Sequence, residues 1–249
     1  MPRPLEFTQI SSDAFKSWSR CKRQFFYKHV KKMQWPSDIQ HFRLGRDVHK
    51  LLDYQARGLD CSLLLENAPM DVRVSWQKLM AHPVAHLPVI ANEWAFHVPM
   101  PTSQGYTEWL TGRIDRVARR EDTVLVIDWK TGTGVPRNPE VDWQTRLYLF
   151  ALVEVAHTQS AADLNLNWHG PLQPEQVRFV YVEVKADNHS PVREVVLDYT
   201  AAKHEATRQT LSAIVSAMAV EESYDLPDNR QCPDKFCAYR TICGIDSLN

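Results

Sequence analysis

The feature that most constrains this chain is a change of hydrophobic period near its middle. Apolar and polar side chains alternate in three segments, at 93–98, 109–118 and 123–130, whereas helical spacings of three and four residues occur before and after them. Glu121 and Asp122 supply a turn between the second and third segments. The pattern predicts a meander of three strands within a chain that is otherwise rich in helices.

Helices and further strands are predicted on both sides of this meander. Ser11 or Ser12 can cap a helix that continues through Phe26 and ends before Trp35 and Pro36. The other predicted elements are a helix at 43–57, a weakly helical stretch at 59–87, a helix at 143–157 capped by Asp142, strands at 177–184 and 192–199, and a helix at 201–220. This order predicts an α/β fold in which helices flank a central sheet of mixed direction.

Length and composition bound the organisation of the chain. Its 249 residues suit a single domain at 1–249, with 59–90 as a helical insertion and 225–249 as a cysteine-rich tail. No apolar run approaches the ~20 residues of a membrane span, and residues 1–8 lack the layout of a signal peptide. We therefore expect a globular protein of the cytoplasm with no membrane partner.

Charge is distributed unevenly along the chain. The formal net charge of −1 gives no overall sign of nucleic-acid binding, but ten Lys or Arg residues and two acids lie between Lys16 and Lys50. Such a segment can face phosphates, and a solvated helix face is an equally good interpretation. Lys22 and Arg23 are the candidate substrate contacts in this segment.

Two aspartates and a lysine are the candidate chemical groups of the meander. Asp128 and Lys130 are two residues apart in a strand, so their side chains share one face of the sheet. Asp115 occupies the neighbouring strand, and its carboxylate can approach that of Asp128. Paired carboxylates suit Mg²⁺ or Mn²⁺, because a divalent ion relieves their repulsion. Surface aspartates at strand ends are the alternative.

Four short stretches together carry a family resemblance. They are Gly45-Arg-Asp-Val-His49-Lys-Leu-Leu-Asp53, Gly112-Arg-Ile-Asp115, Ile127-Asp128-Trp-Lys130-Thr-Gly132 and Gln144-Thr-Arg-Leu-Tyr148. In this order they resemble the RecB-like branch of the PD-(D/E)XK nuclease superfamily, which includes CRISPR-associated RecB-like nucleases and the nuclease domain of AddB. The resemblance implies a restriction-endonuclease-like core and hydrolysis of phosphodiester bonds.

The resemblance also implies roles for individual residues. The implied metal ligands are His49, Asp115, Asp128 and the backbone carbonyl of Trp129; Lys130 would orient or deprotonate water, and Gln144 and Tyr148 would contact DNA or the lysine. Asp115, Asp128 and Lys130 would thus be the catalytic residues. Glu93, at the start of the first strand, can add a further carboxylate.

The cysteines predict a second metal centre. Cys232, Cys237 and Cys243 lie within twelve residues, Cys21 is available near the other end of the chain, and Cys61 stands outside the pattern. In a reducing compartment such cysteines favour metal ligation over disulfides. The resemblance implies a 4Fe-4S cluster, although the four-residue gap after Cys232 is longer than the family's two-residue gap. Zinc, which four thiolates also suit, is the alternative.

The sequence therefore predicts a metal-dependent deoxyribonuclease. Its expected substrate is DNA, single-stranded or with free ends, and its expected setting is DNA repair, recombination or CRISPR adaptation with a helicase or integrase partner. The alternative function is that of a non-catalytic DNA-binding or adaptor protein with a structural metal cluster. The presence of both aspartates and the lysine favours the enzyme.

Overall fold

The computed structural model describes residues 9–33, 42–132, 134–158, 171–187, 189–224, 232 and 237–244. The chain forms two compact units: the first consists of Met1–Ser37, His97–Gly112 and Thr207–Asn249, and the second of Asp38–Phe96 and Arg113–Ala206. Among the described helices, none has the length and hydropathy that crossing a membrane requires.

A mixed sheet forms the centre of the second unit, and the parts of two of its strands within His97–Gly112 belong to the first unit. The strands are β2 (Val89–Pro101), β3 (Thr107–Arg120), β4 (Thr123–Lys130), β5 (Val177–Glu183) and β6 (Arg193–Asp198). β2 and β4 both pair with β3, β4 runs antiparallel to β3 and parallel to β5, and β5 runs antiparallel to β6. The predicted α/β fold with a mixed sheet and the predicted meander are confirmed.

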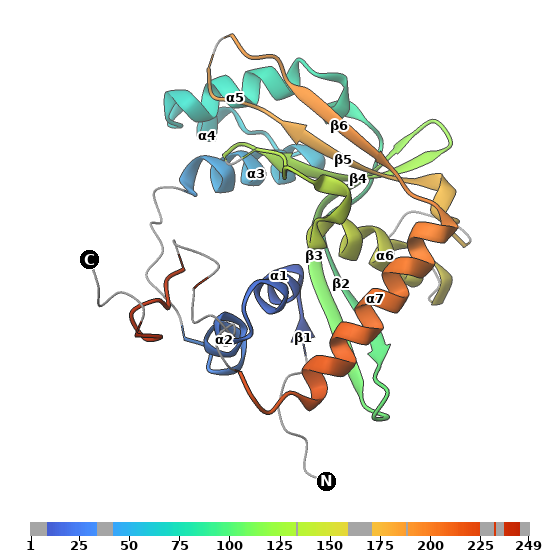
Figure 1. Cartoon of the computed structure of the whole chain (residues 1–249). Coiled ribbons are helices and arrows are strands. Elements are labelled where there is room, and N and C mark those ends of the chain that lie inside the picture. Colours follow the sequence, from blue (N-terminus) through green and yellow to red (C-terminus); the bar gives the residue numbers. More distant parts are fainter. Residues whose placement is uncertain are drawn as a thin grey trace. The chain divides into compact units, whose positions relative to one another are not determined.

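Helices bury both faces of β4. On one face, α3 (Arg43–Ala56) and α5 (Met70–Met80) pack against Ile127 and Trp129 in a shared hydrophobic cluster. On the other, α6 (Trp143–Thr158) lies against β5, where Thr145 bonds to the hydroxyl of Tyr181 at 2.7 Å. Figure 1 shows these helices on opposite sides of the strands. Side chains that alternate along β4 therefore face either α3 or α6.

The weakly helical stretch is confirmed as helical. It contains α4 (Ser62–Glu66), α5 and the 3₁₀ helix η2 (Pro83–His86). Val72 and Leu79 of α5 are buried in the cluster that contains α3 and β4. The prediction that this stretch is an insertion stays a prediction, but its side chains complete the core of the second unit.

The first unit shows one clear difference from the sequence prediction. The single helix expected from Ser12 through Phe26 is wrong: α1 (Ser12–Arg20) ends at Cys21, and α2 (Lys22–Phe25) and the π-helix η1 (Phe26–Val30) follow. Cys21 is extended, with φ −162° and ψ 117°. The rings of Trp18 in α1 and Phe25 in α2 pack edge to face, with their centroids 5.1 Å apart. The apolar residues on the two sides of the break therefore remain in contact, as they would in one continuous helix. Trp35 and Pro36 lie outside the described residues.

The remaining elements of the first unit bring its terminal segments together. β1 (Gln9–Ile10) pairs with β3 in parallel, and after α7 (Ala201–Val220) the chain returns to the N-terminal helices. There Tyr224 stacks on Phe26 at 4.8 Å, and the hydroxyl of Tyr239 donates to the carbonyl of Met33 at 2.8 Å. These contacts join Tyr224 and Tyr239 to the segment that contains α2 and η1.

A fully buried arginine links the elements of the second unit. Arg116 of β3 donates to the carbonyls of Leu52 in α3 (2.8 Å) and Ala85 in η2 (3.1 Å), and to Asn92 Oδ1 in β2 (3.2 Å). Its guanidinium lies over the ring of Trp129, 5.2 Å from the centroid. Burial lowers the pKa of Arg116 to about 10, so the group stays charged at neutral pH. One side chain thus fixes α3 relative to β3 and β4.

Replacing this arginine should destabilise the protein strongly. Arg116→Met fills a similar volume but leaves the carbonyls of Leu52 and Ala85 buried without donors, which should lower the free energy of unfolding by about 2–5 kcal/mol. Urea denaturation followed by circular dichroism measures this change. Arg119→Met, at an exposed position of the same strand, is the control and should cost under about 1 kcal/mol. Equal effects of the two changes would contradict the role given to Arg116.

Candidate active site

Two carboxylates meet where β3 pairs with β4. Arg116 pairs with Ile127, and one further step of this antiparallel register brings Asp115 opposite Asp128. The backbone N–H of Trp129 donates to Asp115 Oδ2 at 3.0 Å, and the side chains of Asp115 and Asp128 are only 14% and 4% exposed. The structure therefore brings together the two aspartates that the sequence singles out, in a largely dehydrated position.

Lys130 and Gln144 surround the carboxylate of Asp128. Lys130 Nζ lies 2.6 Å from Asp128 Oδ2 and donates to Gln144 Oε1 at 3.3 Å, while Gln144 Nε2 donates to Asp128 Oδ1 at 2.5 Å. Gln144 reaches this position because it stands in the first turn of α6, where its N–H bonds to the predicted cap Asp142 at 2.9 Å. The three side chains form one closed network.

His49 reaches the site from α3. Its Nε2 lies 3.0 Å from the carbonyl of Trp129, which makes this nitrogen the donor and leaves Nδ1 as the potential ligand atom. Nδ1 lies 3.6 Å from Asp115 Oδ2. One turn earlier, a Cβ on Gly45 would come within 3.2 Å of Thr131 Oγ1. A glycine there allows α3 to approach the segment that follows β4 and so positions His49.

Glu93 completes a group of three potential ligands. Ligand atoms of His49, Glu93 and Asp115 lie within 4.8 Å of one another. Glu93 has φ 48° in the middle of β2, a left-handed conformation that costs about 1–3 kcal/mol for a residue other than glycine. From the sequence, the Glu93 carboxylate is a candidate for a further ligand. The alternation of apolar and polar residues at 93–98 predicted an ordinary strand and did not indicate this left-handed conformation.

The electrostatics of the two aspartates favour a cation between them. Burial, followed by the charge of Asp128, raises the pKa of Asp115 to about 7, against the opposing effect of His49. Burial also raises the pKa of Asp128, although Lys130 and Gln144 lower it. Asp128 Oδ2 is buried and, although it lies near Lys130, accepts no well-oriented hydrogen bond. Hard oxygen donors beside an imidazole therefore fit Mg²⁺ or Mn²⁺.

A cavity of about 320 Å³ opens onto these groups. Its walls include Asp115, Asp128, Lys130 and Gln144, with Phe42 from the start of α3. The volume falls in the range of small-ligand sites. The carboxylates are therefore buried against the protein but accessible from this cavity.

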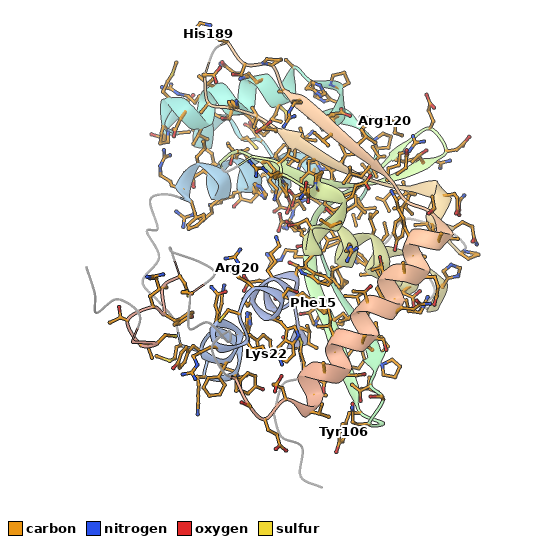
Figure 2. The ribbon with its side chains drawn as sticks, viewed as in Figure 1. Phe15, Arg20, Lys22, Tyr106, Arg120 and His189 are labelled. Carbon is orange, nitrogen blue, oxygen red and sulfur yellow. The ribbon has the colours of Figure 1, made fainter. Side chains whose placement is uncertain are left out.

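The other predicted substrate contacts are Tyr148, Lys22 and Arg23. Tyr148 is 8% exposed and packs on Phe96. It also forms a hydrogen bond with Gln144, so this buried tyrosine helps to position the glutamine side chain. In the first unit, Lys22 lies on α2 (Figure 2). Its ammonium pairs with Glu221. Arg23 Nε donates to the carbonyl of Tyr224 at 3.0 Å. Both basic residues thus form interactions within the first unit, an ion pair for Lys22 and a hydrogen bond for Arg23.

The four predicted cysteine ligands all belong to the first unit. All are thiols; Cys21 is buried, and Cys232, Cys237 and Cys243 are half-buried. Burial raises the pKa of Cys243, Arg23 lowers it, and the other three cysteines raise it further. Cys61 instead lies in the hydrophobic cluster of the second unit.

The chain is similar to known proteins over most of its length. A family model described as "PD-(D/E)XK nuclease superfamily" matches residues 9–244. The solved structure of SSO0001 is similar at 15% identity and a TM-score of 0.44, covering 96% of this chain and 86% of that one. A protein of Eubacterium rectale with a proposed exonuclease activity is similar at 8% identity and a TM-score of 0.48, covering 86% and 83%. No curated protein matches the chain.

The raised pKa of Asp115 predicts a dependence of stability on pH. A carboxyl group whose pKa rises on folding binds its proton more tightly in the folded state, so its stabilising contribution is present below pH 4 and is lost as the pH rises through about 7. Thermal unfolding in EDTA at pH 5 and pH 8 should show this loss, and Asp115→Asn should reduce the difference. At pH 8, Mn²⁺ should restore stability to the wild type more than to the variant.

An equal difference between the two pH values in wild type and Asp115→Asn would contradict the assignment. Other groups also titrate between pH 5 and pH 8. The test is therefore the difference between the wild type and Asp115→Asn in how much stability each protein loses, and not the wild-type curve alone.

Proposed function

The chain belongs to the PD-(D/E)XK nuclease superfamily, and we propose that it is a divalent-metal-dependent DNA nuclease of the RecB-like, iron–sulfur type. The observation that carries this proposal is the burial of Asp115 and Asp128 beside Lys130 in one cavity. Burying two acids at this position costs free energy unless a cation compensates them. If Asp115 and Asp128 had only a structural role, nothing would explain why the protein bears the free-energy cost of burying them.

The proposed ligands are those that the geometry brings together. Asp115 and Asp128 supply carboxylate oxygens, His49 supplies Nδ1, and the carbonyl of Trp129 and the carboxylate of Glu93 lie beside them. When bound, a divalent cation supplies charge neutralisation on the phosphate and lowers the pKa of a coordinated water. The protein itself contributes the orientation of these groups and a position largely shielded from solvent.

Lys130 provides the positive charge beside the phosphate. Its ammonium is held by Asp128 and Gln144, so its position is set before substrate arrives. There it can donate hydrogen bonds to an attacking water or to a phosphate oxygen, where negative charge grows during hydrolysis. Gln144 is a positioning residue because it bonds to both the lysine and the aspartate.

The finer features of the proposal rest on the family resemblance. They are an exonuclease activity on single strands or free ends, a role in DNA repair, recombination or CRISPR adaptation, and a helicase or integrase partner. The cytoplasm is the expected location.

The second part of the proposal is a metal centre held by Cys21, Cys232, Cys237 and Cys243. The influence of Cys21, Cys232 and Cys237 on the pKa of Cys243 supports it, and the break between α1 and α2 contributes by placing Cys21 in an extended, buried position. A cluster there would close a loop of roughly two hundred residues and stabilise the first unit by restricting the unfolded chain. We propose a 4Fe-4S cluster, with zinc as the alternative occupant.

Removing one carboxylate should abolish cleavage. Asp128→Asn keeps the shape of the side chain but removes the charge, so we expect a loss of about a thousandfold or more in cleavage of end-labelled DNA with Mg²⁺ or Mn²⁺. Asp122→Asn, at the exposed turn before β4, is the matched control and should cut as the wild type does. Cleavage that persists in Asp128→Asn would overturn the site. Absence of cleavage by the wild type under all metal conditions would favour a DNA-binding or adaptor protein.

The cysteine centre predicts a second set of phenotypes. Cys237→Ser should lose metal from anaerobically purified protein and lower its melting temperature, because the remaining thiols no longer complete the site. Cys61→Ser, at the cysteine in the core of the second unit, should keep the metal. Iron and zinc analysis with visible absorption identifies the occupant. A Cys237→Ser protein with the full metal content would refute its assignment as a ligand.

A further inference from the structure

A second cavity adjoins the active site along α3. It has a volume of about 550 Å³ and shares Phe42, Gly45 and His49 with the cavity that contains the aspartates. The residues that it takes from α3 recur at three- and four-residue steps, from Phe42 through Arg46 and Lys50 to Arg57. One face of α3 therefore forms a wall that begins at the catalytic groups and continues away from them.

The charges of this cavity are not balanced. Arg57 pairs with Asp53 at 2.9 Å, and Arg113 lies 3.4 Å from Glu93. Arg46 and Lys50 are exposed, line the cavity, and form no ion pair with any described residue. Two positive charges thus remain after the acids of the cavity are paired, one helical turn apart and facing the same space.

An exposed aromatic ring stands at the junction of the two cavities. Phe42 lines both of them and is 61% exposed, an unusual degree for a phenylalanine. A ring in this position can stack on a nucleobase, a contact available to every base because each has a π face. An aromatic platform followed by spaced cations is the arrangement by which proteins bind single strands.

We propose that this cavity binds the DNA strand next to the phosphate that is cut, with Arg46 and Lys50 on successive phosphates and Phe42 stacked on a base. The proposal rests on the proposed nuclease function and names the side from which the strand enters that site. It assigns strand binding to α3, whereas the sequence pointed to Lys22 and Arg23 of α2. Lys22 pairs with Glu221, and Arg23 bonds to the backbone of Tyr224.

The test separates binding from cleavage. Fluorescence anisotropy in EDTA measures the affinity for a short, labelled single strand of DNA at several salt concentrations, with no divalent metal for cutting. The double variant Arg46→Glu and Lys50→Glu should bind at least about tenfold more weakly, and its plot of log affinity against log salt should flatten by about 1.4, since each phosphate contact on a single strand contributes about 0.7.

The matched control is a double charge reversal elsewhere on the second unit. Arg73 and Lys185 are exposed and line neither cavity. Changing both to Glu alters the net charge by the same amount, so a general electrostatic effect would appear equally in both double variants. Phe42→Ala should weaken binding about tenfold with an unchanged salt slope, and Phe42→Trp should restore it.

Each outcome decides the proposal. Weaker binding and a flatter slope confined to the Arg46 and Lys50 variant support it, whereas equal losses in both double variants, or an unchanged slope, overturn it. Unchanged binding by Phe42→Ala overturns the stacking contact. A wild type that binds in EDTA but never cuts with metal would refute the nuclease while leaving the binding result valid.

Discussion

The antiparallel pairing of β3 with β4 is the constraint on which the rest of the second unit depends. Its register brings Asp115 opposite Asp128 on the face toward α6, and it turns Arg116 toward α3 on the other face. The buried guanidinium then attaches α3 to the sheet through Leu52 and Trp129. His49, three residues before Leu52, is thereby held beside the carbonyl of Trp129. A slip of one residue in this register would separate all of these groups.

The buried charged groups of β3 and β4 affect both the stability of the fold and the chemistry of the candidate site. Two carboxylates are kept in a position where their own ionisation is unfavourable, as the raised pKa of Asp115 shows. The arginine beneath them is costly to bury as well, but its hydrogen bonds and its stacking on Trp129 satisfy it. The structure therefore compensates the buried charge of Arg116 internally. We propose that a bound divalent cation compensates the two carboxylates.

The sequence predicted most of the regular elements and the closeness of Asp115, Asp128 and Lys130, for identifiable reasons. β4 and α7 have long, uniform patterns and were predicted with the observed bounds. The proximity of Asp128 to Lys130 follows from the period of a strand. The break at Cys21 was missed because two short helices in contact preserve the apolar spacing of one long helix. The left-handed conformation of Glu93 and the cavity along α3 depend on tertiary packing, which local patterns do not contain. The residue roles themselves remain predictions.

The central claim is that the buried aspartates hold a divalent cation. Crystals grown with Mn²⁺ and measured at the manganese absorption edge test it most directly, because the anomalous signal identifies both the element and its position. We expect a peak within coordination distance of Asp115, Asp128 and the carbonyl of Trp129, with His49 or Glu93 among its neighbours. Fully occupied crystals with no peak at these oxygens, or with manganese bound only elsewhere, would contradict it.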